Sequence, residues 1–266
     1  TTYILLIIAL VWTIFPVYWM IKSSITVNSE MYVARPSLIA KHYTFENYVD
    51  LFTKTEFPRA LLNSLMIAFL TTVCCLLISI LGSYAMTRLK YPGRRFFKTS
   101  IIFSYLIPTA VLFVPMYVFV SKLGFYDNKW ALLIIYPTTV VPYCCYMLMS
   151  YFKAIPYALE EAALIDGCTR MKSLRYIITP IALPGIAVVA TFAFTMSWNE
   201  YLYAMIMTTS PAQQTAVVAI SSFKYADSAI WGRIMAASVL TSLPVTIIYI
   251  VAQAQLISGK SDGSVK

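Results

Sequence analysis

The chain has 266 residues, of which 60% are hydrophobic and only 12% are charged, and its formal net charge is +9. An ordinary soluble domain carries about 25% charged residues, so this composition excludes a soluble globular protein. The positive charge does not indicate nucleic-acid binding here, because membrane proteins concentrate Lys and Arg in their cytoplasmic loops.

Six segments of the chain contain no charged residue, and each is 21 to 28 residues long. About 20 consecutive apolar residues cross a bilayer as a helix. One such segment can be a buried helix of a soluble protein, but six predict an all-α membrane protein with six transmembrane helices. The segments are residues 1–21, 60–87, 99–121, 130–152, 176–199 and 234–259.

The first segment predicts a transmembrane helix over Tyr3 to Ile21. It has no basic residues before it and no small-residue cleavage site after it, which argues against a signal peptide. In the loop that follows, residues 44–52 alternate apolar and charged residues with helical spacing behind Thr44, a good N-cap residue. We expect a short amphipathic helix on the outer membrane surface there.

The second span begins near Ala60 and ends at a loop, residues 88–98, that holds five Lys or Arg and no acid. Such a loop is expected in the cytoplasm, and alternation then places both chain termini there as well. Spans three and four each contain two prolines, which kink transmembrane helices. The fifth span is predicted over 182–207 and the sixth over 234–256. The four prolines are Pro108, Pro115, Pro137 and Pro142.

The predicted spans divide the chain into four parts. Residues 1–25 form the first transmembrane helix, and residues 26–59 form an extracytoplasmic loop with an interfacial helix. Residues 60–258 form a core of five transmembrane helices with a cytoplasmic loop at 153–181. Residues 259–266 form a cytoplasmic tail.

Catalysis is poorly supported by the sequence. The single histidine, His42, lies in the outer loop, where a solvated side chain is the more ordinary interpretation. Gly259-Lys260-Ser261 looks like the end of a phosphate-binding loop, but Ala254 stands where the motif needs its first glycine. Adjacent cysteines on a helix diverge too far to share a metal, so we expect no disulfide, no metal and no bound cofactor.

Glu200 is the one ionisable residue inside the fifth span. Acids buried in a membrane are functional by default. Starting from Ala182, however, Glu200 would lie about 27 Å along the helix, close to the outer interface. A structural or interfacial carboxylate is therefore an equally good interpretation of this residue.

The segment with the clearest chemistry is Glu160-Glu-Ala-Ala-Leu-Ile-Asp-Gly167. Pro156 suits the first turn of a helix and Gly167 suits its end, which predicts a helix over 157–166 about 15 Å long. Thr169 is placed to cap a second, basic helix. The pattern favours either a docking element for a partner's groove or an ordinary solvated loop.

This segment resembles the Glu-Ala-Ala loop of importer permeases of the ATP-binding cassette class. Glu161-Ala-Ala163, Asp166-Gly167 and Ile177-x-Thr-Pro180 carry the resemblance, with Thr179 in place of the usual leucine. Further matches over nearly the whole chain are similar to the carbohydrate-uptake branch, and within it to the six-span partner of the maltose-type permease pair. They are Phe15-Pro-Val-Tyr-Trp19, Phe45-Glu-Asn-Tyr48, Asn63-Ser64, Leu123-Gly124, Ile155-Pro156, Trp198-Asn-Glu200 and Gly263-Ser-Val-Lys266.

The resemblance implies a type I importer permease fold, also called MetI-like, in a bacterial inner membrane. It implies a second permease subunit, two cytoplasmic ATPases that hold ATP and Mg²⁺, an extracytoplasmic sugar-binding protein and surrounding lipid. It also implies that ATPase coupling falls to Glu161, Ala162, Ala163, Asp166 and Gly167, with Glu160 either sharing the contact or facing water. Separately, we expect the translocation path at Asn63, Trp198, Asn199, Glu200 and Tyr201. The aromatic side chains at 198–203 either stack on sugars or anchor at the interface.

Three alternative functions remain open from the sequence. They are an ion-coupled secondary carrier, a passive channel, and a permease of the same class with a non-sugar cargo. The lack of an obvious internal repeat counts mildly against carriers built from inverted halves. Uptake that survives loss of the ATPases would favour the carrier.

Overall fold

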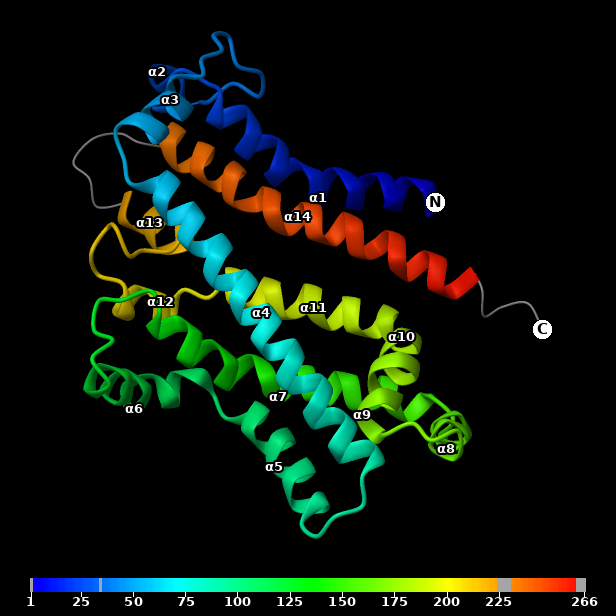
Figure 1. The fold of residues 1–266 in the computed structure, drawn as a ribbon. Coiled ribbons are helices and arrows are strands. Elements are labelled where there is room, and N and C mark those ends of the chain that lie inside the picture. Colours follow the sequence, from blue (N-terminus) through cyan, green and yellow to red (C-terminus); the bar gives the residue numbers. More distant parts are fainter. Residues whose placement is uncertain (1, 34, 224–230, 262–266) are drawn as a thin grey trace. The chain divides into compact units, whose positions relative to one another are not determined.

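Figure 1 shows the chain in a computed structural model that describes residues 2–33, 35–223 and 231–261. Within these ranges the regular elements are helices, and an isolated β-bridge joins Thr26 to Tyr43. The helices are α1 (Thr2–Ser24), α2 (Asn28–Met31), α3 (Glu46–Thr53), α4 (Phe57–Arg88), α5 (Arg94–Leu106), α6 (Thr109–Lys122), α7 (Ala131–Ala154), α8 (Tyr157–Ile165), α9 (Arg170–Ser173), the π-helix η1 (Leu174–Ile178), α10 (Thr179–Ile181), α11 (Leu183–Trp198), α12 (Leu202–Met207), α13 (Ala216–Ser222) and α14 (Trp231–Ser261).

Four of the described helices are long and apolar enough to cross a membrane: α1, α4, α7 and α14. Two pairs of shorter helices pass the same test together, and six spans result when each pair is counted as one. The prediction of an all-α membrane protein with six spans is thus confirmed. The tail predicted at 259–266 begins inside α14, and its residues 262–266 lie outside the described residues.

The third span is broken where a kink was predicted. α5 ends at Leu106, α6 begins at Thr109, and their axes differ by 99°. Ile107 between them is extended, with φ −71° and ψ 121°. A residue before proline is disfavoured in the helical region, so Pro108 explains why the helix ends instead of bending. Pro115, Pro137 and Pro142 stand inside helices that continue past them.

The fifth span was predicted as one helix over 182–207, and this is wrong at its C-terminal end. α11 ends at Trp198, and α12 starts again at Leu202 after three non-helical residues. At the other end, the segment Arg170–Ile181 meets α11 at an angle of 82°. α11 alone, with 16 residues, is about 24 Å long, so the polar residues 199–201 interrupt the span near its end.

The chain forms two compact units, and each has its own core. The first unit comprises Thr1–Ser64 and Thr208–Thr246. Its core is built mainly from alanines, which let α4, α13 and α14 approach closely around Leu51 of α3. The predicted helix at 44–52 is therefore present as α3, and Asn47 and Leu51 are its buried residues. The core residues are Leu51, Phe57, Ala60, Ala216, Ala219, Ala236 and Ala237.

The second unit comprises Leu65–Met207 and Ile247–Lys266. Here α7 packs against α5 and α11, and small hydroxyl residues of α4 are fully buried. One of them, Ser83, donates a hydrogen bond to the Cys145 carbonyl of α7, at 3.0 Å. The apolar core of this unit is Cys75, Tyr84, Val140, Cys144, Leu148, Phe152, Ile155, Leu174, Ile178, Ala182, Ile186, Val189 and Ala193.

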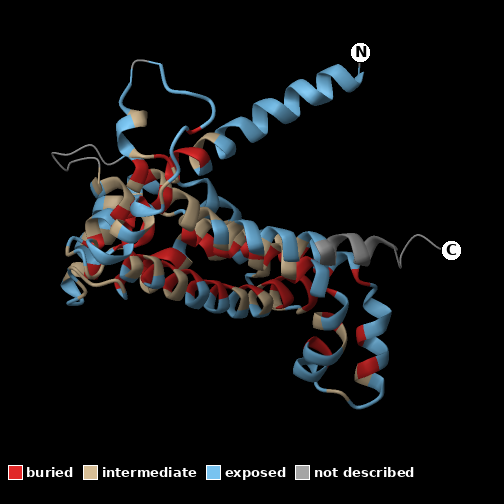
Figure 2. Cartoon of the chain, turned by 90° about the horizontal axis from the view of Figure 1, so that it is seen from above, coloured by how far each residue is buried: buried red, intermediate tan, exposed pale blue. Residues whose placement is uncertain are grey.

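The first helix adds little to either core. Figure 2 shows α1 exposed along almost its whole length, with burial confined to Lys22, Ser23 and Ser24 at its C-terminal end. Most of its side chains from Tyr3 to Val17 are large, apolar and exposed. Such a surface is suited to lipid or to a neighbouring membrane helix rather than to water.

Candidate functional site

The predicted loop helix is present as α8, one residue shorter than expected. Pro156 precedes it in an extended conformation, with ψ 136°. Its C-terminus ends in a Schellman motif. The Gly167 amide donates a hydrogen bond to the Leu164 carbonyl, and the Cys168 amide donates one to the Ala163 carbonyl. Gly167 has φ +83°, which glycine adopts without the steric cost that other residues pay. The predicted stop at Gly167 is confirmed.

The chain after Gly167 forms the second helix that the sequence predicted. The Thr169 hydroxyl accepts a hydrogen bond from the Lys172 amide at 3.3 Å and caps α9. The helix then passes into the π-helix η1, whose Leu174 and Ile178 are buried in the core. The loop helix is therefore anchored on its C-terminal side through η1.

The two glutamates at the centre of α8 have different surroundings. Glu160 and Ala163 are buried, whereas Glu161, Ala162 and Ile165 are exposed. The Ile165 side chain is 85% exposed, although this loop lies outside the predicted spans. Because positions three and four apart share a helix face, α8 has one face on its own unit and one free face.

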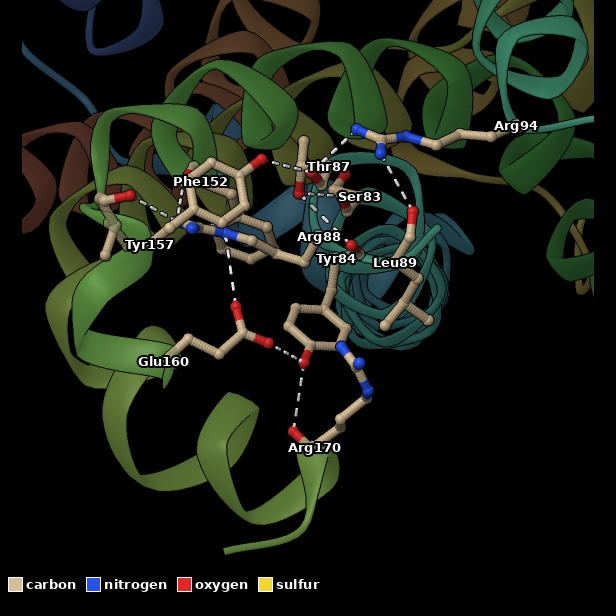
Figure 3. Close-up of polar contacts among 11 residues, drawn as sticks. Ser83, Tyr84, Thr87, Arg88, Leu89, Arg94, Phe152, Tyr157, Glu160 and Arg170 are labelled. Atoms are coloured by element: carbon tan, nitrogen blue, oxygen red, sulfur yellow. Dashed lines mark hydrogen bonds and ion pairs between the residues drawn. The ribbon is translucent and has the colours of Figure 1, made fainter. Parts of the chain in front are cut away.

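A buried arginine lies under the inner face of α8 (Figure 3). Arg88 is the last residue of α4 and is 6% exposed. Its Nη2 donates hydrogen bonds to the carbonyl oxygens of Phe152 and Ile155, the second at 2.6 Å. These carbonyls belong to the end of α7, where a cation is favoured by the helix dipole. Arg88 thus joins the ends of α4 and α7.

Glu160 lies against this arginine and against a tyrosine of α4. The Tyr84 hydroxyl donates a hydrogen bond to Glu160 Oε1. Glu160 Oε2 lies 3.8 Å from Arg88 Nε, and the side chains of the pair are 6% and 0% exposed. Tyr84 Oη also lies 3.5 Å from the Arg170 carbonyl oxygen. Because the phenol has a single proton, the nearer carboxylate is its acceptor.

Tyr157, at the start of α8, makes two further contacts with α4. Its hydroxyl donates a hydrogen bond to the Thr87 carbonyl at 2.8 Å. The Arg88 guanidinium lies over its ring, 4.2 Å from the centroid, which is a cation–π geometry. Arg94 caps the same end of α4, with hydrogen bonds to the carbonyls of Met86, Thr87 and Leu89.

A cavity of about 940 Å³ opens between α8 and the turn after α4. Glu160, Glu161 and Leu164 line it from α8. Four basic side chains line the rest, so positive charge predominates in its wall. These are Arg88, Lys90, Arg94 and Arg170.

The residues predicted for the translocation path occur in two places. In the second unit, Trp198 is 2% exposed and stacks on Phe194 with ring centroids 5.5 Å apart. Glu200 accepts hydrogen bonds from the amides of Tyr203 and Ala204, at 3.0 and 3.1 Å. Its carboxylate therefore caps the N-terminus of α12, a structural task for an acid in a span. Asn199 and Tyr201 beside it are exposed.

Asn63 belongs to the first unit. Its side-chain amide donates to the carbonyls of Ala212 and Gln214, at 3.1 and 3.0 Å. The neighbouring Ser64 hydroxyl accepts from the Ala216 amide at 2.8 Å. This pair thus fastens the segment before α13 to α4.

Sequence reasoning missed Tyr84 and Arg88. Arg88 was counted only as one of five positive charges that orient the loop 88–98. One signal was available: adjacent glutamates on one short helix point about 100° apart, which allows them different surroundings in a chain with only 11 acids. Finding the partner of Glu160 still required the folded structure.

Most of the chain matches a known family of membrane transport proteins. A family described as "Binding-protein-dependent transport system inner membrane component" matches residues 78–260, well over half of the chain. The chain belongs to this family. Its members are non-catalytic membrane subunits, so the resemblance to importer permeases of the ATP-binding cassette class is confirmed.

Similar proteins cover nearly the whole chain. The inner membrane ABC transporter permease protein YcjP of Escherichia coli (strain K12) is 36% identical over 97% of this chain and 92% of its own length. The trehalose/maltose transport system permease protein MalG of Thermococcus litoralis is 33% identical over 95% of this chain and 91% of its own. A chain of a bacterial ABC transporter involved in alginate import superposes with a TM-score of 0.83 at 22% identity, over 95% of this chain and 94% of that one, which shows the same fold.

Proposed function

We propose that this chain is one permease subunit of an ATP-driven, binding-protein-dependent carbohydrate importer. It pairs with a second permease, with two cytoplasmic ATPases that bind ATP and Mg²⁺, and with an extracytoplasmic sugar-binding protein. Family membership supports the transport role. The name of MalG, a trehalose/maltose permease, supports a di- or oligosaccharide as the cargo.

The observation that carries this proposal is the free face of α8. It combines an exposed isoleucine, small alanines and two acids on a helix that a proline and a glycine delimit. Tyr157 and Leu159 of the same short helix are exposed as well, and several exposed apolar side chains beside charged residues suit a helix that docks in a partner's groove. Alanines let the helix sit deeply in a cleft of the ATPase, while Glu161 and Asp166 meet basic groups there.

ATP binding closes the two ATPases, and their motion pushes α8 as a lever. The spans that follow α8 re-pack, and the cavity of the permease pair then opens to the outside. In this arrangement the loops 88–98 and 153–181 and both termini lie in the cytoplasm of a bacterial cell. The concentration of Lys and Arg in residues 88–98 supports this orientation.

The coupling role is tested by Glu161→Lys in the complete transporter. We expect the variant to insert normally but to lose ATPase binding and ATP-driven uptake, because its new charge meets basic groups. Glu56→Lys is the matched control, since Glu56 is also exposed but lies in the predicted extracytoplasmic loop. Normal assembly and uptake by Glu161→Lys would contradict the proposed role of α8.

The cargo is tested with the reconstituted complex and its binding protein. ATP hydrolysis is measured while the binding protein is loaded in turn with monosaccharides, disaccharides and longer oligosaccharides. Stimulation by one size class identifies the cargo. Uptake that persists without the ATPases and collapses with the proton gradient would instead establish an ion-coupled carrier.

We further propose that the interruption of the fifth span borders the translocation path. Asn199 and Tyr201 are the exposed residues at this interruption, while Trp198 and Glu200 hold its shape. Asn63 belongs to the other unit, where it fixes the loop before α13, and its assignment to the path stays a prediction. Asn199→Ala should raise the sugar concentration needed for half-maximal uptake without changing assembly. An unchanged value in Asn199→Ala and Tyr201→Ala alike would remove both from the path.

A further inference from the structure

We propose that Tyr84, Arg88 and Glu160 form a latch that positions α8 on the cytoplasmic ends of α4 and α7. We call these three residues the α8 latch (Figure 3). The inference rests on the proposed function of α8 and adds a specific role. Glu160 acts within its own chain as a positioning residue, whereas Glu161 meets the ATPase.

The first argument is the accessibility of Glu160. Its side chain is 6% exposed, so a partner protein cannot reach it without moving α8. Each carboxylate oxygen already faces a group of α4, with Oε1 bonded to Tyr84 and Oε2 beside Arg88. Glu161 on the next position is exposed. Two adjacent acids on one helix therefore have separate tasks.

The second argument is the charge of Arg88. Its Nη2 binds two carbonyl groups, but Nε and Nη1 are buried without a hydrogen-bond partner among the described residues. Carbonyl dipoles offset only part of a full positive charge. The Glu160 carboxylate is the anion beside it. Breaking such a buried pair leaves an uncompensated charge, so the two side chains stay together while the helices move.

The third argument is where the latch is attached. Arg88 is bonded to the end of α7, which leads directly into α8. Tyr84 and Glu160 bind α8 to α4, and the Tyr157 hydroxyl adds a second link at Thr87. The N-terminal half of α8 thus moves with two spans. Force applied to its free face reaches α4 and α7 directly instead of being lost in loop motion.

The test uses Glu160→Gln in the complete reconstituted transporter. Three quantities are measured: the amount of ATPase that copurifies, the rate of ATP hydrolysis, and the sugar imported per ATP hydrolysed. Glutamine keeps an acceptor for Tyr84 but removes the charge that Arg88 needs. We expect wild-type ATPase binding and a roughly tenfold lower ratio of sugar to ATP, as for loss of one charge-assisted contact.

Two further variants make the result decisive. Glu161→Gln is the matched control and should reduce ATPase binding rather than the ratio of sugar to ATP. Tyr84→Phe removes only the hydroxyl and with it the hydrogen bond to Glu160, which Glu160→Gln retains. Tyr84→Phe should therefore lower the ratio by itself, and because both contacts hold the same side chain, the double variant should lower it by less than the product of the two single effects. If Glu160→Gln does not accumulate in the membrane, Tyr84→Phe alone must lower the ratio.

The outcomes separate this inference from the proposed function. A normal ratio of sugar to ATP in Glu160→Gln and Tyr84→Phe overturns the latch. Loss of ATPase binding in Glu160→Gln also overturns it and makes Glu160 a docking residue, which leaves the proposed function intact. Normal ATPase binding and uptake in Glu161→Lys would instead refute the coupling role of α8 itself. A fall in thermal stability without a change in the ratio would show a merely structural contact.

Discussion

Gly185 allows α11 to lie against α7, and replacing it with alanine gives a clear prediction about packing. A Cβ atom at this position would lie 2.5 Å from both Cδ1 and Cγ of Tyr151 and 2.8 Å from Cδ2. Ordinary contact needs about 1 Å more. Because Cγ is next to the tyrosine Cβ, the ring cannot avoid the methyl group by turning about its own axis. Either the Tyr151 side chain changes rotamer or the two helices separate.

The expected cost follows from two opposing effects. Overpacking of this kind destabilises by about 1–3 kcal/mol. Alanine is favoured over glycine in a helix by up to about 1 kcal/mol, which acts in the other direction. In the wild-type background the net effect of Gly185→Ala should therefore be a destabilisation of up to about 2 kcal/mol. In a Tyr151→Ala background the clash is gone, and the same change should stabilise.

The assay is thermal unfolding of the purified transporter at one fixed scan rate, for the wild type, both single variants and the double variant. About 1 kcal/mol corresponds to a shift of roughly 2–4 °C for a chain of this size. The reasoning is refuted if Gly185→Ala lowers the midpoint as much with Tyr151→Ala as without it. The cost would then arise elsewhere than at this contact.

Three further predictions concern the loop helix, the buried charge pair and the outer loop. Gly167→Ala places a side chain at φ +83°, where no atom lies within 4 Å of the new methyl group. It should lower the free energy of unfolding by about 1–2 kcal/mol through backbone strain alone. Gly167→Asn should lower it by less in the same unfolding assay, because asparagine adopts positive φ more readily. Arg88→Met should destabilise the protein by about 3–5 kcal/mol because it leaves Glu160 buried without its counter-charge. The double variant Arg88→Met with Glu160→Gln should be closer to the wild type in stability. Equal losses of stability in the single and the double variant would argue against a stabilising ion pair between Arg88 and Glu160. The His42 hydrogen bond holds the pKa of Glu30 below its ordinary value of 4.5, so this contact stabilises the loop above that pH and the stabilisation is lost as the pH falls through the lowered pKa. Hydrogen exchange at the Lys41 amide, which is bonded to Glu30 Oε2, should lose protection over that range, and His42→Ala should lose much of it at every pH.

The spans and the loop helix were predictable because their signals are local. A run of about 20 uncharged residues identifies a span wherever it occurs. Pro156 and Gly167 fix the ends of α8 through their own backbone preferences, so the predicted bounds are correct to within one residue. Pro108 was recognised as a perturbation, but its conversion of a kink into a 99° break depends on packing around it.

The remaining errors concern contacts between distant residues. The break at 199–201 lies in an apolar window that carries one acid at its edge, and the sequence does not show that Glu200 caps a new helix. Arg88 and Glu160 lie in different predicted loops, and neither loop contains a signal for the other. The different surroundings of Glu160 and Glu161 therefore became visible only when α4 was placed beside α8.

The arginines at the end of α4 have two separate roles. Arg88 and Arg94 contribute to the basic loop that is predicted to orient the chain in the membrane. Both also donate hydrogen bonds to helix-terminal carbonyls, Arg88 at the end of α7 and Arg94 at the end of α4. In the proposed arrangement, membrane orientation and transmission of force from α8 thus depend on the same side chains. A substitution at Arg88 or Arg94 that changes the charge of this loop therefore also removes hydrogen bonds at the ends of α4 and α7. Lys90, Arg95 and Lys98 are the loop charges that can be changed, to alter the predicted orientation of the chain in the membrane, without removing these hydrogen bonds.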